Sequence, residues 1–124
     1  MSNSSPVQRR LASFRHAFRG LFMVVRTQPN AWFHVFASLV VIGLATWLRL
    51  GAIEWCLLIL SIAAVSSAEA MNTGIEKLAD AVHPDPHPLV GQAKDAAAAG
   101  VLLVAGGALV VGVLVLGPAL EKAL

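Results

Sequence analysis

Four polar residues at helical spacing are the strongest candidates for chemistry in this sequence. They are Glu69, Asn72, Glu76 and Asp80, separated by three, four and four positions. At about 100° per residue in an α-helix they fall within roughly 60° of one another, as a polar stripe about 16 Å long. Glu69 lies inside an apolar run, where a buried carboxylate costs a few kcal/mol, so it needs a partner or a function.

Carboxylates, an amide and a lysine together suit phosphoryl transfer. Lys94 and Asp95 follow a proline-rich segment that can bring them back to the depth of the stripe. One carboxylate can hold Mg²⁺ against phosphate oxygens, a second can take the proton of an attacking hydroxyl, and the lysine can offset charge on the phosphates. The sequence contains no Walker A motif and no kinase-type glycine loop, so a nucleotide site here would have another design.

The polar stripe is also compatible with roles outside phosphoryl transfer. Glu69 could be the relay group of a proton- or ion-conducting oligomer, although the remaining polar residues are more than a relay needs. The chain could be a non-catalytic assembly subunit, which would leave the acidic stripe unexplained. A solvated helix end is a further interpretation of the stripe, disfavoured because Glu69 lies too deep in the apolar run, and Lys94 and Asp95 could simply flank a helix start.

Histidines offer a further set of candidate ligands. His34, near the start of an apolar run, is more typical of a packing or headgroup contact than of a ligand. His83, Asp85 and His87 alternate with prolines. Because such segments point alternate side chains variably, a metal cluster there is disfavoured.

Three apolar runs must position these residues in a membrane. The 124-residue chain is 57% hydrophobic and only 13% charged, more apolar than a soluble domain of this size could bury. Each run can cross a hydrocarbon core of about 30 Å, so we predict an all-α integral membrane protein with a single domain over 1–124. The predicted spans are about 31–48, 53–75 and 96–119, joined by a short turn at 49–51 and a non-helical linker at 83–88.

A basic segment precedes the first span. Residues 1–26 hold five of the nine Lys and Arg residues and no Asp or Glu. From about 9 to 26, apolar residues recur on one side of a helix and arginines on another. This pattern predicts an amphipathic helix on the membrane surface, among anionic lipid headgroups, rather than a nucleic-acid-binding segment. By the positive-inside rule, the N-terminus and the polar stripe face the cytoplasm of a bacterial inner membrane.

The third apolar run is rich in small residues at four-residue spacing. Such residues let helix backbones approach closely in a membrane, so the pattern predicts self-association. The small residues are Ala96, Gly100, Ala108 and Gly112, with Ala99 and Gly107 beside them.

The literal sequence around the polar stripe is more specific than its spacing. The string EAMNTGIE at 69–76, followed by Asp80 and by AKD at 93–95, closely resembles the prokaryotic diacylglycerol kinase family. The resemblance covers nearly the whole chain and implies three spans with an N-terminal surface helix. The string Arg19-Gly20-Leu21 before the first span, and Asn30 with His34 at its start, also resemble the branch that includes undecaprenol kinases. The Asn30 and His34 pair favours undecaprenol slightly over diacylglycerol as the acceptor.

The resemblance implies an ATP-dependent lipid kinase that works as a homotrimer with sites shared between subunits. Glu69 would then be the general base for the lipid hydroxyl, and Glu76 would hold the Mg²⁺ that bridges the ATP phosphates. Gln28 stands where the family usually has a second metal-binding glutamate, and its neutral amide can still ligate Mg²⁺ with less charge. Further residues at positions where the family contacts ATP are Arg9, Asn72, Asp85, His87, Lys94 and Asp95.

Overall fold

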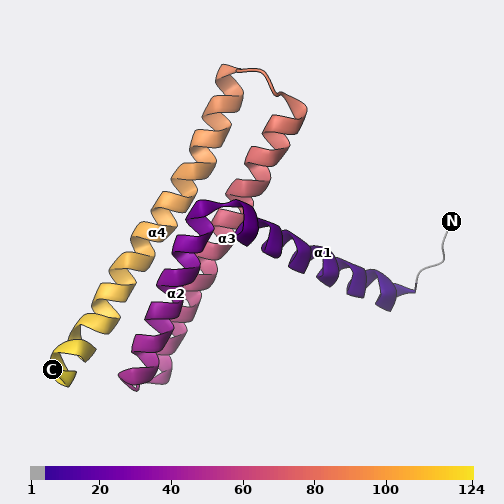
Figure 1. The fold of residues 1–124 in the computed structure, drawn as a ribbon. Coiled ribbons are helices and arrows are strands. Elements are labelled where there is room, and N and C mark those ends of the chain that lie inside the picture. The colour runs from indigo at the N-terminus through magenta and orange to yellow at the C-terminus, as the bar shows by residue number, and fades with distance from the viewer. Residues whose placement is uncertain (1–4) are drawn as a thin grey trace.

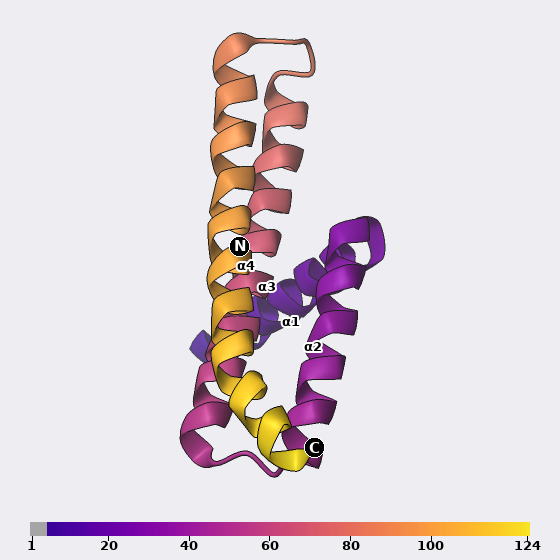
Figure 2. The same cartoon turned by 90° about the vertical axis from the view of Figure 1, so that its left-hand side faces the viewer.

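A computed structural model describes residues 5–124, and its regular structure is entirely helical. The helices are α1 (Pro6–Thr27), α2 (Pro29–Trp47), α3 (Ala52–Val82) and α4 (Pro88–Ala123). Helices α3 and α4 form a long antiparallel hairpin, α2 runs beside one part of it, and α1 projects away at a steep angle (Figure 1). The turned view in Figure 2 shows that α2 diverges from α4, and most helix–helix contacts are between α3 and α4. The all-α prediction is confirmed.

Helices α2, α3 and α4 are each long and apolar enough to cross a membrane, as predicted. The first predicted span matches α2 within two residues, whereas the second and third are shorter than the helices that contain them. Helix α3 continues to Val82 and α4 already begins at Pro88. The polar side chains at these ends lower the local hydropathy but do not end the helix, because the helix is held by backbone hydrogen bonds that polar residues also form.

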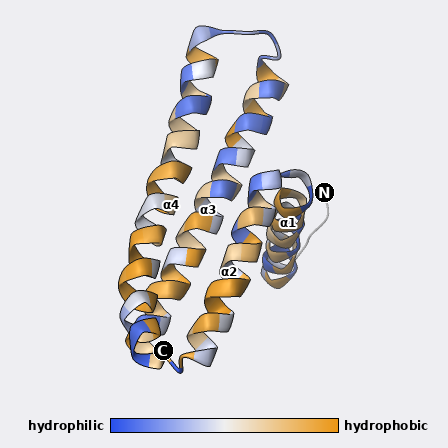
Figure 3. Cartoon of the chain, turned by 60° about the vertical axis from the view of Figure 1, so that its left-hand side comes forward, coloured by the Kyte–Doolittle hydropathy of each residue, from blue (hydrophilic) through white to orange (hydrophobic). Residues whose placement is uncertain are grey.

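The excess length places polar helix ends outside an apolar layer. The 31 residues of α3 and the 36 of α4 correspond to about 46 and 54 Å of helix, against a hydrocarbon core of about 30 Å. Hydrophilic residues gather on the ends of α3 and α4 next to their linker, and hydrophobic residues cover most of α2 (Figure 3). The 19 residues of α2, about 28 Å, match the apolar layer alone.

Prolines and one unusual residue set the helix boundaries. Gln28 is extended, with φ −109° and ψ 116°, because the residue before a proline avoids the helical region, so α1 ends and Pro29 starts α2. Arg49 has a left-handed φ of 53°. The N–H of Leu50 bonds the carbonyl of Ala45, and that of Arg49 bonds Thr46, which is a Schellman end to α2.

Few side chains are buried within one chain. The main apolar cluster consists of Ala45, Leu58 and Leu116, one from each of α2, α3 and α4. Many large apolar side chains of the described helices are exposed, as expected of surfaces that face lipid or neighbouring subunits. The small residues of α4 do not support a close contact within the chain, because a Cβ added at Gly100, Gly107 or Gly112 would meet nothing within 4 Å.

Candidate active site

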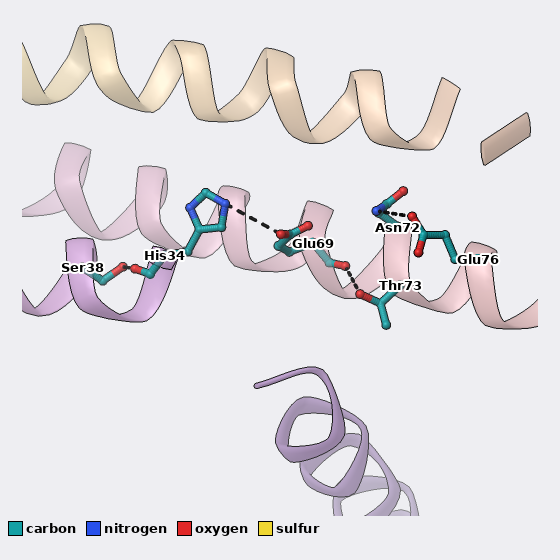
Figure 4. Close-up of polar contacts among 6 residues, drawn as sticks. All are labelled: His34, Ser38, Glu69, Asn72, Thr73 and Glu76. Carbon is teal, nitrogen blue, oxygen red and sulfur yellow. Dashed lines mark hydrogen bonds and ion pairs between the residues drawn. The ribbon is translucent and has the colours of Figure 1, made fainter. Parts of the chain in front are cut away.

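Glu69 is buried on the face of α3 that meets α2. It is only 5% exposed, and its Oε1 atom has no hydrogen-bond partner within residues 5–124. The Nε2 atom of His34, in the second turn of α2, lies 3.8 Å from that oxygen and points toward it (Figure 4). Burial of a carboxylate is costly unless it is paired, so the two side chains form the polar centre of an otherwise apolar helix contact.

Thr73 fixes the backbone next to Glu69. It is 2% exposed, and its hydroxyl donates to the carbonyl of Glu69 at 2.9 Å. The hydroxyl is therefore satisfied locally and does not compete for the carboxylate. Glu69 keeps its acceptor oxygens for another group.

Asn72 and Glu76 lie one helical turn apart, closer to the linker. The amide of Asn72 donates to Oε1 of Glu76 at 3.2 Å, and Asn72 Oδ1 is buried without a partner in the described chain. The bond engages one carboxylate oxygen of Glu76 (Figure 4), so Glu76 and Asn72 each keep an oxygen acceptor. Oxygens of this kind are the ligands that Mg²⁺ prefers, so these residues fit the predicted metal.

Lys94 of α4 donates to a carboxylate oxygen of Asp80 across the hairpin. The contact confirms that the linker returns Lys94 to the level of the polar stripe, although its partner is Asp80 rather than the deeper Glu69. Asp80 lies about 16 Å along the helix from Glu69. The stripe therefore runs from a buried carboxylate to an exposed ion pair.

The remaining predicted ligands are not gathered around Glu76 within one chain. Arg9 is exposed in the first turns of α1, which extend away from the hairpin (Figure 1). Gln28 is half-buried at the α1–α2 junction, and its side chain makes no capping hydrogen bond to α2. Asp95 is exposed on α4.

The linker is ordered by its own hydrogen bonds. The Nδ1 atom of His83 lies 2.9 Å from the carbonyl of Asp85, which can only accept, and Nδ1 of His87 accepts from the N–H of Leu89 at 3.2 Å. The His83 and His87 rings lie 5.1 Å apart. Residues 5–124 contain no group of three or more His, Cys, Asp or Glu side chains placed to hold a metal.

A groove of about 800 Å³ separates α2 from the hairpin below the polar stripe. Its walls are almost entirely apolar, with residues such as Val41, Ile62, Leu109 and Leu116 from the three helices. His34 and Ser38 line it as well, so the histidine that faces Glu69 also borders the groove. The sequence pattern predicts a packing or headgroup contact for His34, whereas the structure places it opposite Glu69. Its position one turn into an apolar helix is the sequence signal for a contact with another buried polar group.

The fold and site define a small helical membrane protein in which a buried carboxylate is followed along α3 by further oxygen acceptors and, across the hairpin, by a lysine. The chain belongs to the prokaryotic diacylglycerol kinase family, whose sequence profile matches residues 15–116. It is 38% identical to undecaprenol kinase of Bacillus subtilis over 87% of this chain and 88% of that relative. It is 40% identical to a diacylglycerol kinase of Synechocystis over 89% of this chain and 63% of that relative.

A diacylglycerol kinase of Helicobacter pylori is 34% identical over 73% of the chain and 76% of its own length. These relatives confirm the family inferred from the EAMNTGIE string and indicate a lipid kinase that uses ATP as co-substrate. The ion-conducting and assembly-subunit alternatives find no support among them.

Proposed function

We propose that this chain transfers the γ-phosphate of MgATP to the primary hydroxyl of a membrane lipid, with Glu69 as general base. The observation that carries the proposal is the burial of Glu69 with one carboxylate oxygen unpartnered in the described chain. A base for a lipid hydroxyl has to lie at headgroup depth, shielded from bulk water, with a free acceptor oxygen. The burial of Glu69 and its unpartnered oxygen support this role.

The lengths of the helices support a position near the membrane surface for Glu69. Helix α2 matches the apolar layer, and His34 is in its second turn, so Glu69 lies just beneath the surface at which α2 begins. Glu76 lies about 10 Å further along α3, beyond that surface. A lipid hydroxyl can therefore reach Glu69 from the membrane while ATP phosphates approach Glu76 from water.

Each residue then has one task. A carboxylate oxygen of Glu69 accepts the proton of the lipid hydroxyl while the hydroxyl oxygen attacks the γ-phosphorus and the bond to the β-phosphate oxygen breaks. Glu76 and Asn72 Oδ1 would hold Mg²⁺, which supplies positive charge to the phosphates when bound. Lys94, with Asp80 beside it, orients and neutralises phosphate oxygens. Asp95, Asp85 and His87 are proposed to contact the nucleotide.

Completing the site requires neighbouring chains. Arg9 and Gln28 lie on or next to α1, and we propose that they reach the nucleotide and its metal ion in a homotrimer whose sites are shared between subunits. The open glycines of α4 and the exposed apolar surfaces support such packing. The chain, a single kinase domain over 1–124, would lie in the bacterial inner membrane with α1 on the cytoplasmic surface. Phe14, Phe18 and Phe22 of α1 are all exposed, as contact with lipid requires.

Undecaprenol is the acceptor we favour, because the match to undecaprenol kinase of Bacillus subtilis covers 88% of that relative's own length, whereas the match to the Synechocystis diacylglycerol kinase covers 63% of its length. The test is phosphorylation by purified protein in mixed micelles with radiolabelled ATP, offering undecaprenol and diacylglycerol side by side. Label in undecaprenol with little in diacylglycerol is the expected result. Label in neither lipid, from protein whose helical content is intact, would contradict the proposal.

A further inference from the structure

The environment of Glu69 contains one feature that the proposed base role does not explain. Glu69 is 5% exposed, and within residues 5–124 its single basic partner at ion-pair distance is His34, at 3.8 Å. Its Oε1 atom, the one that faces His34, has no hydrogen bond within the same residues. A buried acceptor left in this state costs free energy unless a donor reaches it during function.

The His34 ring is placed to be that donor. The nearby hydroxyl of Ser38 donates to the backbone carbonyl of His34 at 2.7 Å. Ser38 therefore does not occupy either ring nitrogen of His34. The ring of Phe33 stands nearly perpendicular to it, at 74° with centroids 5.7 Å apart, an edge-to-face contact that restricts the imidazole. Figure 4 shows Nε2 directed toward Glu69 and the second ring nitrogen directed away from it.

We infer that His34 is a positioning residue for Glu69, donating its Nε2–H to Oε1 and leaving Oε2 to accept the proton of the lipid hydroxyl. This inference rests on the proposed function and assigns a role to a residue outside the polar stripe. The present 3.8 Å separation exceeds a hydrogen bond by about 1 Å, a gap that a small side-chain rotation closes. Catalytic hydrogen bonds often tighten only when substrate is bound.

A purely structural role for His34 makes a different prediction. The groove that His34 borders is otherwise almost entirely apolar, and the His34 side chain is only 22% exposed. An apolar side chain of similar size would fill this wall at least as well as an imidazole. A packing role would therefore leave a leucine at position 34 fully acceptable, whereas a positioning role requires a donor there.

The experiment compares His34→Leu, which removes the donor, with His34→Gln, whose amide nitrogen can donate over a similar reach. Steady-state kinetics with undecaprenol and ATP in mixed micelles should show a kcat about 10- to 100-fold lower for His34→Leu, because a misplaced catalytic group costs up to that factor. KM for both substrates should stay within about twofold. The amide should restore kcat to within about fivefold of the wild-type value.

Ser38→Ala is the matched control, because it changes the same wall of the groove without touching the ring, and its kcat should be unchanged. Thermal unfolding in detergent checks each variant. If the thermal unfolding midpoint of His34→Leu is clearly below that of the wild type, His34→Met, which is unbranched and also lacks a donor, takes its place.

Three outcomes would overturn the inference. The first is a wild-type kcat in the apolar variant, and the second is an equal loss in His34→Leu and His34→Gln. The third is a raised KM for the lipid with kcat unchanged, which would place His34 on the substrate instead. Glu69→Gln assayed in parallel separates the two proposals: an inactive Glu69→Gln beside a fully active His34→Leu removes the inference alone, whereas an active Glu69→Gln removes the base role itself.

Discussion

The imidazole of His34 and the carboxylate of Glu69 face each other across the contact between α2 and α3, with Nε2 3.8 Å from Oε1. The pair ties the start of the short helix α2 to the middle of the much longer α3. In the proposed membrane arrangement the pair would lie near the level at which the hairpin leaves the apolar layer.

Replacing Glu69 by glutamine should abolish turnover. The amide keeps the size of the side chain but is too weakly basic to take the proton of the lipid hydroxyl. We therefore expect kcat to fall by at least about 100-fold. Helical content and subunit association should remain, because Oε1 of the carboxylate makes no hydrogen bond in the described structure that the amide would break. Retention of most of the activity in the phosphorylation assay would exclude Glu69 as the base.

Replacing Glu76 by glutamine should change the magnesium requirement. The substitution removes a negative charge beside Asn72 Oδ1 but keeps an oxygen that can still accept from Asn72. We expect the half-saturating Mg²⁺ concentration to rise by about tenfold or more, measured at saturating ATP. An unchanged Mg²⁺ dependence would count against a metal role for this residue.

Replacing Gln28 by glutamate should have the opposite effect. If Gln28 ligates the metal ion through its neutral amide oxygen, a carboxylate there adds charge to the site and should lower the half-saturating Mg²⁺ concentration by about three- to tenfold. Gln28→Ala should raise it. Identical Mg²⁺ titrations for the wild type and both variants would remove Gln28 from the metal site.

Substitutions in the Lys94–Asp80 pair can distinguish a structural role of Lys94 from a role in binding the nucleotide. Both side chains are partly exposed, so their mutual attraction should contribute less than about 1 kcal/mol to stability. Lys94→Met and Asp80→Asn both break the pair and should shift thermal unfolding equally little. Only Lys94→Met should raise KM for ATP or lower kcat by about tenfold or more, since it alone removes positive charge from the phosphates. Equal kinetic losses in both variants would reduce Lys94 to a structural partner.

The left-handed Arg49 offers a test of the fold that is independent of activity. Its φ of 53° costs about 1 kcal/mol for a residue with a Cβ and nothing for glycine. Arg49→Gly should therefore raise the thermal unfolding midpoint in detergent, whereas Arg49→Ala should not. A lower midpoint for the glycine variant would show that the arginine side chain contributes more than the strain removes.

Hydropathy and helical spacing are local properties, so the sequence is sufficient to predict the helices and the polar stripe. The helix ends are harder to predict. Residues 76–82 and 88–95 each contain three charged or amide side chains, and these interruptions predict the end of an apolar span, yet both segments are helical and belong to α3 and α4. The prolines predict the linker correctly, apart from Pro88, which lies in the first turn of α4. A proline is tolerated there because the missing N–H would have no partner within the helix.

Contacts between helices could not be predicted from spacing alone. Helical periodicity places Glu69 and Asp80 on one face but does not give their partners, which come from α2 and α4. His34 is the single histidine of its apolar run, and its position one turn into that run does not name its partner, so the contact with Glu69 is seen only in the three-dimensional structure. The proposal that Arg9 and Gln28 join the stripe of a neighbouring chain stays a prediction.

The scarcity of buried side chains within one chain has a consequence for the protein in its bilayer. In lipid there is little hydrophobic driving force between helices, so helix association depends on close packing, and here the internal apolar cluster is small. Stability should then be shared among copies and obey mass action. Dilution into excess lipid should lower the unfolding temperature progressively. The number of copies per area of membrane would then control both the stability and the total activity of the enzyme.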